Sequence, residues 1–100
     1  MKIYEGRRKD YAAIVTVNGR PLNPRLELRN HSPTEFEWGY GGSGPAQLAL
    51  AILADCIGSE AALKHYQKFK RAVVASLPYK EWTLTEEQVR EALRASDTEL

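Results

Sequence analysis

The stretch WGYGGSGPAQLALAILADCI, residues 38–57, joins a glycine-rich turn directly to the most apolar segment of the chain. Pro45 is favoured at the first position of a helix, where its missing N–H has no partner to lose, and the sequence therefore predicts Gly44 as the N-cap. Residues 46–57 contain only two polar side chains, so we expect a helix that is buried on more than one face. Gly58 can adopt the left-handed conformation that ends such a helix. The segment is shorter than the roughly 20 apolar residues of a membrane span.

The turn before this helix is a candidate site for an anion or a nucleotide. Free N–H groups and the helix dipole favour phosphate or carboxylate groups at a helix N-terminus, and aromatic rings beside them can stack on a base. The candidate ligand-binding residues are Trp38, Tyr40, Gly41, Gly42, Ser43, Gly44 and Gln47, together with His31 from the preceding loop. The pattern is not a Walker loop, because no Lys-Ser or Lys-Thr pair follows the last glycine, and it is not a clear dinucleotide fingerprint. The residues alone favour the competing interpretation, a tight turn whose aromatic side chains cover the core.

Length and composition indicate a single globular domain over residues 1–100. The chain has 100 residues, of which 43% are hydrophobic, and this fits one modest core. Residues 1–10 are charged and contain no apolar segment, so no secretion signal is predicted. Cys56 is the only cysteine; it cannot form an internal disulfide, and we expect a cytoplasmic location. One cysteine and two distant histidines predict no zinc site, and we predict no cofactor.

The net charge of +1 conceals blocks of unlike charge. Residues 31–58 contain three acidic residues and no Lys or Arg, so an anion bound at the glycine-rich turn needs a cation from elsewhere in the chain. Two basic faces, at residues 7–9 and 64–71, are the alternative candidates for contact with nucleic acid. Their members are Arg7, Arg8, Lys64, Lys68 and Arg71. Solvated loop and helix surfaces are the commoner explanation of such charges.

The remaining patterns predict an α+β fold, in which a small antiparallel N-terminal sheet of three to four strands packs on the central buried helix, with two further helices around it. The expected strands cover residues 2–8, 11–17, 20–22 and 25–28, with an Asn18-Gly19 hairpin turn. A final short strand or extended segment is expected at residues 35–38, and a short connector or strand at residues 79–84. The expected helices cover residues 45–57, residues 60–76 and a last segment that follows a capping box at residues 85–88. Asp55, in the buried helix, needs a partner such as a tyrosine hydroxyl or an arginine.

The run FEWGYGGSGPAQLA, residues 36–49, resembles the signature of an uncharacterised family of small proteins from bacteria, archaea and phages, a domain of unknown function. Other matching parts are Asn30-His31-Ser32-Pro33, Tyr66 with Phe69-Lys70, and Leu77-Pro78 followed by Trp82 and Leu84. The resemblance spans most of the chain. It implies a small stand-alone protein, often carried on mobile or viral genomes, and it transfers no catalytic residues.

Three function classes follow. The first is a non-catalytic binding module that uses residues 38–47 for a small anionic or nucleotide-like ligand or for a partner protein, and the phage resemblance implies a role in phage–host conflict. The second is nucleic-acid binding through the two basic faces. The third is a homo-oligomeric structural protein, because a helix apolar on all sides can require a second subunit to cover it. An enzyme is the least supported class, because the chain shows no nucleophile–base pair, metal set or catalytic motif. No membrane partner is predicted.

Overall fold

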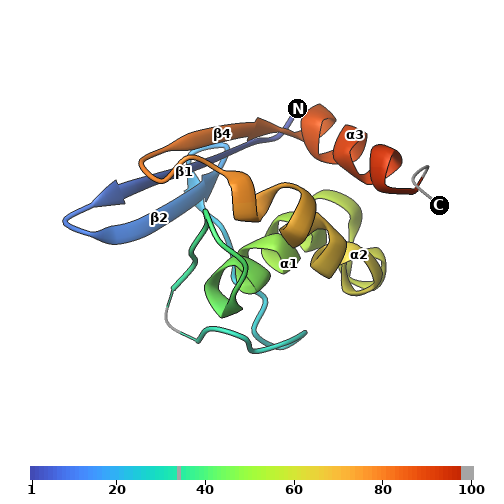
Figure 1. The fold of residues 1–100 in the computed structure, drawn as a ribbon, viewed down its shortest axis with the longest axis horizontal. Coiled ribbons are helices and arrows are strands. Elements are labelled where there is room, and N and C mark those ends of the chain that lie inside the picture. The colour runs from blue at the N-terminus through green and yellow to red at the C-terminus, as the bar shows by residue number, and fades with distance from the viewer. Residues whose placement is uncertain (34, 98–100) are drawn as a thin grey trace.

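A layer of antiparallel strands lies against a layer of helices in the computed structural model, which describes residues 1–33 and 35–97 (Figure 1). Among these residues the sheet has four strands in the order β3-β2-β1-β4. The elements are β1 (Ile3–Lys9), β2 (Ala12–Val17), β3 (Arg20–Pro21), α1 (Ser43–Ile57), α2 (Ser59–Ala72), the short 3₁₀ helix η1 (Val74–Ser76), β4 (Trp82–Thr85) and α3 (Glu86–Asp97). The predicted α+β fold is confirmed.

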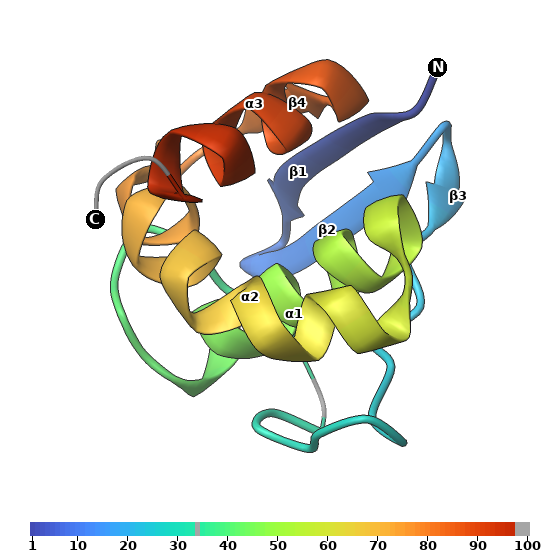
Figure 2. The ribbon, with the colours of Figure 1, turned by 90° about the vertical axis from the view of Figure 1, so that its right-hand side faces the viewer.

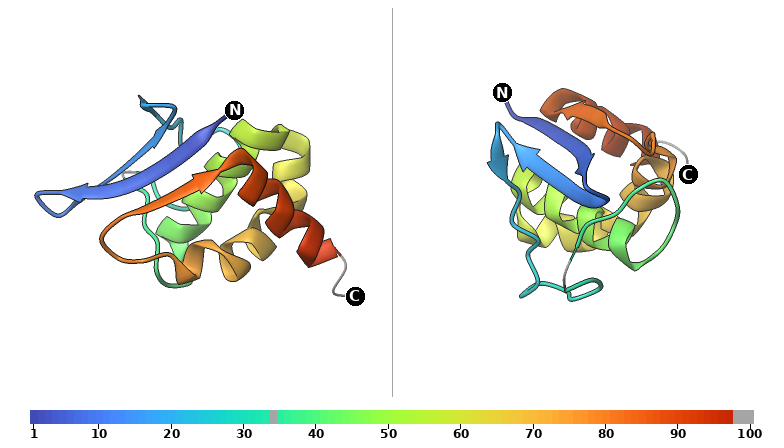
Figure 3. Two further views of the ribbon diagram at one scale, coloured as in Figure 1. Left: turned by 90° about the horizontal axis from the view of Figure 1, so that it is seen from above. Right: turned by 90° about the vertical axis from the view of Figure 1, so that its left-hand side faces the viewer.

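The first three strands form from local signals. β1 and β2 pair from Tyr4 with Val17 to Lys9 with Ala12, and β2 turns into β3 through Asn18 and Gly19. These two turn residues have φ angles of 49° and 81°, as a type I′ hairpin requires, so the predicted turn is confirmed. The β1–β2 hairpin projects beyond the helices (Figure 3), and the molecule measures 41 × 25 × 25 Å along its principal axes.

The strand predicted at residues 25–28 is wrong, because residues 26–28 form a turn. Leu28 N–H donates to the Arg25 carbonyl at 3.0 Å, and Arg25 has a positive φ of 57°. The fourth strand is instead β4, which comes from the far end of the chain and pairs with β1 from Ile3 opposite Thr85 to Gly6 opposite Trp82. Residues 35–38 belong to no strand.

Helix α1 is the centre of the core. It lies beneath the sheet, and α2 turns back along its other side (Figure 2). Its residues from Gly44 to Ala54 are all buried. The helix begins at Ser43 with Gly42 as N-cap, two residues before the predicted start, so Pro45 lies within the first turn. The predicted end is confirmed, since Gly58 has φ 93° and donates its N–H to the Ala54 carbonyl at 3.1 Å.

The other helices complete the layer. α2 ends at Ala72, before the predicted end, and the chain continues into η1. The capping box of α3 is confirmed: Gln88 N–H donates to Thr85 Oγ1 at 3.1 Å, and Thr85 N–H donates to Gln88 Oε1 at 2.9 Å. α3 continues from β4 and packs beside α2 (Figure 3). Within residues 1–33 and 35–97 no helix has the length and apolar character that crossing a membrane requires.

Candidate functional site

The glycine-rich turn is filled by the chain's own side chains. A Cβ atom added to Gly42 would lie 2.7 Å from the Tyr40 ring, and one added to Gly44 would lie 2.6 Å from Glu37 Cβ. Gly39 has φ 89° and donates its N–H to the Val74 carbonyl at 3.0 Å. The close approach that these glycines permit is therefore made by neighbouring parts of the same chain, as the architectural interpretation of the turn expects.

Trp38 lies in the core and does not offer a face for stacking on a ligand. Its side chain is 1% exposed, its Nε1–H donates to the Tyr79 carbonyl at 2.9 Å, and its ring meets Trp82 edge to face at 5.6 Å. Of the other candidates in the turn, Tyr40 is 52% exposed, and Gly41 and Ser43 are also exposed. Gly42 is half-buried, and Gly44 and Gln47 are buried.

Arg8 binds the turn to the sheet. Its side chain leaves β1 on the inner face, and the guanidinium lies 4.4 Å from the Trp38 ring centroid and 3.9 Å from that of Tyr79. Both terminal nitrogens donate to the Glu37 carboxylate, at 2.8 and 3.1 Å, and Nε–H donates to the Tyr79 carbonyl. The hydrogen bonds with Glu37 raise the pKa of Arg8. The charge of Arg8 is thus paired, and its side chain is only 11% exposed, which leaves little of the predicted basic face at this residue.

The Arg8–Glu37 pair predicts an acid-dependent loss of stability. The hydrogen bonds from Arg8 hold the pKa of Glu37 below its ordinary value. The folded state therefore binds a proton less readily than the unfolded state, so the contribution of the pair is fully present above the ordinary glutamate pKa and is lost as the pH falls through the lowered pKa. We expect the difference in unfolding free energy between wild type and Glu37→Gln to be constant near neutral pH and to shrink in acid. Urea denaturation across that pH range measures it, and a difference independent of pH would contradict the assignment.

Gln47 and His31 belong to one cluster that fixes the loop between β3 and α1. The Gln47 side chain is fully buried. Its Oε1 accepts from the N–H groups of His31 and Ser32, and its Nε2 donates to the Pro24 and Arg29 carbonyls. The His31 ring nitrogen Nε2 lies 2.8 Å from the Tyr66 hydroxyl. The structure thus brings these two predicted residues together, but their polar groups are engaged with the loop and with α2.

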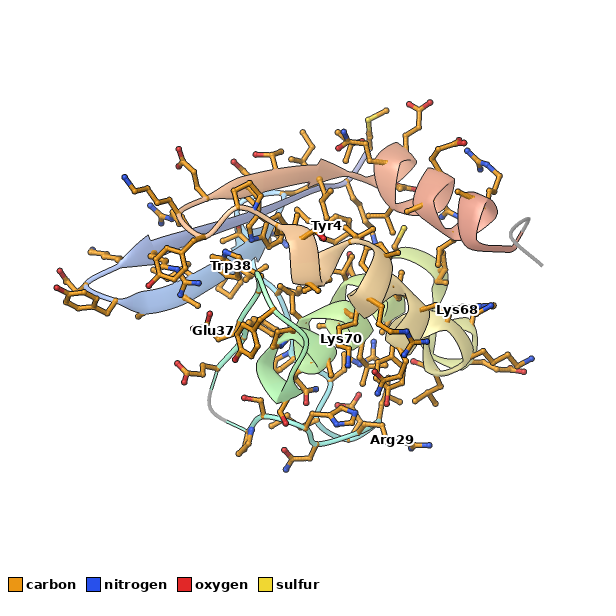
Figure 4. The ribbon with its side chains drawn as sticks, viewed as in Figure 1. Tyr4, Arg29, Glu37, Trp38, Lys68 and Lys70 are labelled. Carbon is orange, nitrogen blue, oxygen red and sulfur yellow. The ribbon has the colours of Figure 1, made fainter. Side chains whose placement is uncertain are left out.

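The two predicted basic faces lie apart. Lys64, Lys68 and Arg71 are exposed along α2, whereas Arg7 lies on the projecting hairpin (Figure 1). Figure 4 shows Lys68 on the outer side of α2, well away from Trp38 and Glu37. No carboxylate of the described part of the chain lies within 4 Å of the three α2 cations. The α2 cations form a basic surface of their own, and neither Arg7 nor Arg8 extends it.

A surface that the sequence did not predict lies at the end of the β1–β2 hairpin. Asp10 and Tyr11 form the hairpin turn with φ angles of 51° and 72°, so Tyr11 lies outside the strand predicted for it. Its side chain is 93% exposed, and that of Tyr79 is 65% exposed. A hollow of about 610 Å³ is lined by both tyrosines and by Arg8. The exposed lining residues Arg7, Asp10, Tyr11, Tyr79, Lys80 and Glu81 are called the hairpin-end surface below. The Asp10-Tyr11 pair between two strand patterns could have predicted the turn. No local sequence pattern could have predicted that this turn lies beside residues 79–81.

Asp55 has the partner expected of it. Tyr4 donates its hydroxyl hydrogen to Asp55 Oδ2 at 2.8 Å, and Lys2 Nζ lies 3.2 Å from the same oxygen. Burial, together with this hydrogen bond, raises the pKa of Tyr4. Burial also raises the pKa of the Cys56 thiol, which leaves it a poor nucleophile. Over residues 1–33 and 35–97 no three or more His, Cys, Asp or Glu side chains are placed to hold a metal ion.

Comparison with known proteins assigns the chain to a family without assigning an activity. Residues 4–95 match the model of a family of unknown function, DUF6166, and the chain belongs to that family. The resemblance to an uncharacterised domain is thereby confirmed. No curated protein and no solved structure matches the chain. The function must therefore be inferred from the surfaces described above.

Proposed function

We propose that this member of the DUF6166 family is a non-catalytic binding module that recognises a partner protein through the hairpin-end surface. The observation that carries the proposal is that two exposed tyrosines, Tyr11 and Tyr79, line the same hollow. Large exposed aromatic side chains bring much contact area with few rotatable bonds, and Tyr and Arg are enriched at the energetic centres of protein interfaces.

Tyr79 is held by the residues beneath it, and Tyr11 has a constrained backbone. Tyr79 rests on the Arg8 guanidinium, and its carbonyl accepts hydrogen bonds from Arg8 Nε and from Trp38 Nε1. Tyr11 occupies the left-handed region, which is unfavourable for an aromatic residue and is found where the surrounding structure imposes it. A side chain that is already positioned loses less conformational entropy when a partner binds.

The charges of the hairpin-end surface favour a protein over a phosphate-rich ligand. Arg7 and Lys80 are balanced by Asp10 and Glu81, and the charge of Arg8 beneath them is paired with Glu37. A surface for nucleotides or nucleic acid usually carries a clear excess of positive charge. Mixed charges around exposed aromatic rings instead resemble the polar rim and aromatic centre of a protein interface.

The test compares three tyrosines. Tagged wild type, Tyr11→Ser, Tyr79→Ser and Tyr40→Ser are used to capture a partner from cells, and the captured protein is purified and titrated against each variant. We expect binding to weaken about thirtyfold for Tyr11→Ser or Tyr79→Ser and to be unchanged for Tyr40→Ser, the matched control in the glycine-rich turn.

The reverse result, in which only Tyr40→Ser weakens binding of the partner, would assign recognition to the glycine-rich turn. Native mass spectrometry of the freshly purified wild type provides the second measurement. A bound small molecule that survives all three substitutions would replace the partner protein as the ligand.

Nucleic-acid binding is the second candidate function, and the basic surface of α2 supports it. Its exposed cations Lys64, Lys68 and Arg71 have no carboxylate neighbour among the side chains that the structure describes, so their charges are free to attract phosphates. Binding by this route weakens steeply with added salt. Oligonucleotide affinity that depends on these cations and is insensitive to Tyr11→Ser would favour it over the first proposal.

A further inference from the structure

The outer edge of β2 is left open at Ala13. β3 pairs with β2 at Val17 and Thr16, and the pairing continues with a hydrogen bond of 3.1 Å from Leu22 N–H to the Val15 carbonyl. Backbone groups of alternate residues point to the same side of a strand, so the N–H and carbonyl of Ala13 point outward, as the Val15 carbonyl does.

Proline explains why the pairing stops there. In the β2–β3 register the residue opposite Ala13 would be Pro24, which has no N–H to donate. The Pro24 carbonyl points elsewhere and accepts a hydrogen bond of 2.6 Å from Gln47 Nε2. In the described part of the chain, Ala13 therefore has no strand partner on its outer side.

A groove runs along this open edge. It has a volume of about 270 Å³ and lies between β2 and the loop that precedes α1. Apolar side chains form most of its lining, among them Ile14, Pro21, Pro24 and Phe36, and the one charged side chain in it is Glu35. Glu35 is exposed and has no cation within 4 Å in the portion of the chain described.

We infer that this groove binds an extended peptide segment of a partner protein, which pairs with the Ala13 edge of β2, places apolar side chains in the groove and sets a Lys or Arg against Glu35. The open N–H and carbonyl require a backbone that can both donate and accept, which is the basis of strand addition. The prolines cannot provide the donor, and the unpaired carboxylate is complementary to a cation. The inference is independent of the hairpin-end surface.

The experiment first selects peptides that bind the chain and then measures which groups of the groove their affinity depends on. A phage-displayed library of short random peptides is panned on the wild-type chain and on Ala13→Pro, which removes the outward N–H and leaves the ladder to β1 intact. We expect peptides enriched on wild type alone to alternate apolar residues and to carry one Lys or Arg.

For the best synthetic peptide, titration is expected to show affinity about tenfold lower for Ala13→Pro and a similar loss when the peptide amide opposite Ala13 is N-methylated. Glu35→Lys is expected to reverse the preference for a Lys-containing peptide over its Glu counterpart. Tyr79→Ser, a change in the hairpin-end surface, should leave peptide affinity unchanged, so that failure of one proposal is distinguishable from failure of the other.

Several results overturn the inference. Enrichment of the same peptides on Ala13→Pro, or no enrichment on wild type, shows that the edge does not bind extended peptides. A wild-type dimer that Ala13→Pro converts to monomer assigns the edge to a second copy of the chain. If Ala13→Pro does not fold, the test rests on Glu35→Lys: the inference is overturned if this variant still prefers the Lys-containing peptide over its Glu counterpart.

Discussion

Replacing Gly6 by valine is expected to lower the free energy of unfolding by about 3 kcal/mol. Gly6 lies in the middle of β1, between Val15 of β2 and Trp82 of β4. The Trp82 indole covers it, so that a Cβ atom at position 6 would lie 2.3 Å from both Cε2 and Nε1 of that ring. Trp82 is 6% exposed and is held edge to face by Trp38, and it therefore cannot move aside without disturbing the core. Denaturant unfolding followed by circular dichroism measures the loss.

Gly41→Ala is the matched control for this experiment. A Cβ atom at Gly41 would meet no described atom within 4 Å, and we expect a change within about 0.5 kcal/mol. The double variant Gly6→Ala with Trp82→Leu should lose less unfolding free energy than the two single variants added together, because leucine at position 82 no longer clashes with the new Cβ atom. Equal and small losses for Gly6→Val and Gly41→Ala would show that Trp82 does not pack rigidly on β1.

The parts of the fold that the sequence predicted are those specified by neighbouring residues. The apolar run of α1 and its terminating Gly58 lie within one segment, and so do the Asn18-Gly19 turn and the capping box at residues 85–88. Each of these depends on interactions a few residues apart, and each requires a backbone conformation or a cap that few residue types can supply. Such signals need no knowledge of the rest of the chain.

The parts that were not predicted depend on distant partners. β4 has only four residues and joins the sheet through β1, at the other end of the chain, and a short alternating segment does not identify its neighbour. The predicted strand at residues 25–28 failed because the Pro24 and Arg29 carbonyls on either side of it are captured by the Gln47 side chain. That competition between a side chain and a strand partner is invisible in the local pattern.

The same distinction applies to the candidate site. The glycines of the turn indicated close approach, but sequence does not say whether a ligand or the chain's own Tyr40 and Glu37 approaches. Arg7 and Arg8 are adjacent and chemically alike, yet the alternation of β1 exposes Arg7 and places Arg8 between Trp38 and Tyr79. The hairpin-end surface depends on that inward arginine, which is why no motif revealed it.

Gln47→Leu is expected to lower the free energy of unfolding by about 3 kcal/mol. Leucine keeps the volume of this fully buried side chain but leaves four backbone groups without their partner: the N–H groups of His31 and Ser32 and the carbonyls of Pro24 and Arg29. Leaving a buried N–H or carbonyl without a hydrogen bond destabilises the folded state by more than that hydrogen bond had stabilised it. The loop should also open locally, which hydrogen exchange at the His31 and Ser32 amides would report as faster exchange.

Three further variants separate the cluster's parts. Gln67→Leu makes the same chemical change on α2, where no hydrogen bond to the Gln67 side chain occurs within the described residues, and should change stability by less than about 0.5 kcal/mol. His31→Ala removes the hydrogen bond and the ring contact with Tyr66, but its backbone N–H still reaches Gln47, and it should lower the free energy of unfolding by about 1 kcal/mol. Gln47→Glu keeps the acceptor for the two N–H groups but sets a carboxylate against two carbonyls. It should therefore lower the free energy of unfolding almost as much as Gln47→Leu. If Gln47→Leu were no worse than Gln67→Leu, the loop would be held by its apolar contacts and not by this amide.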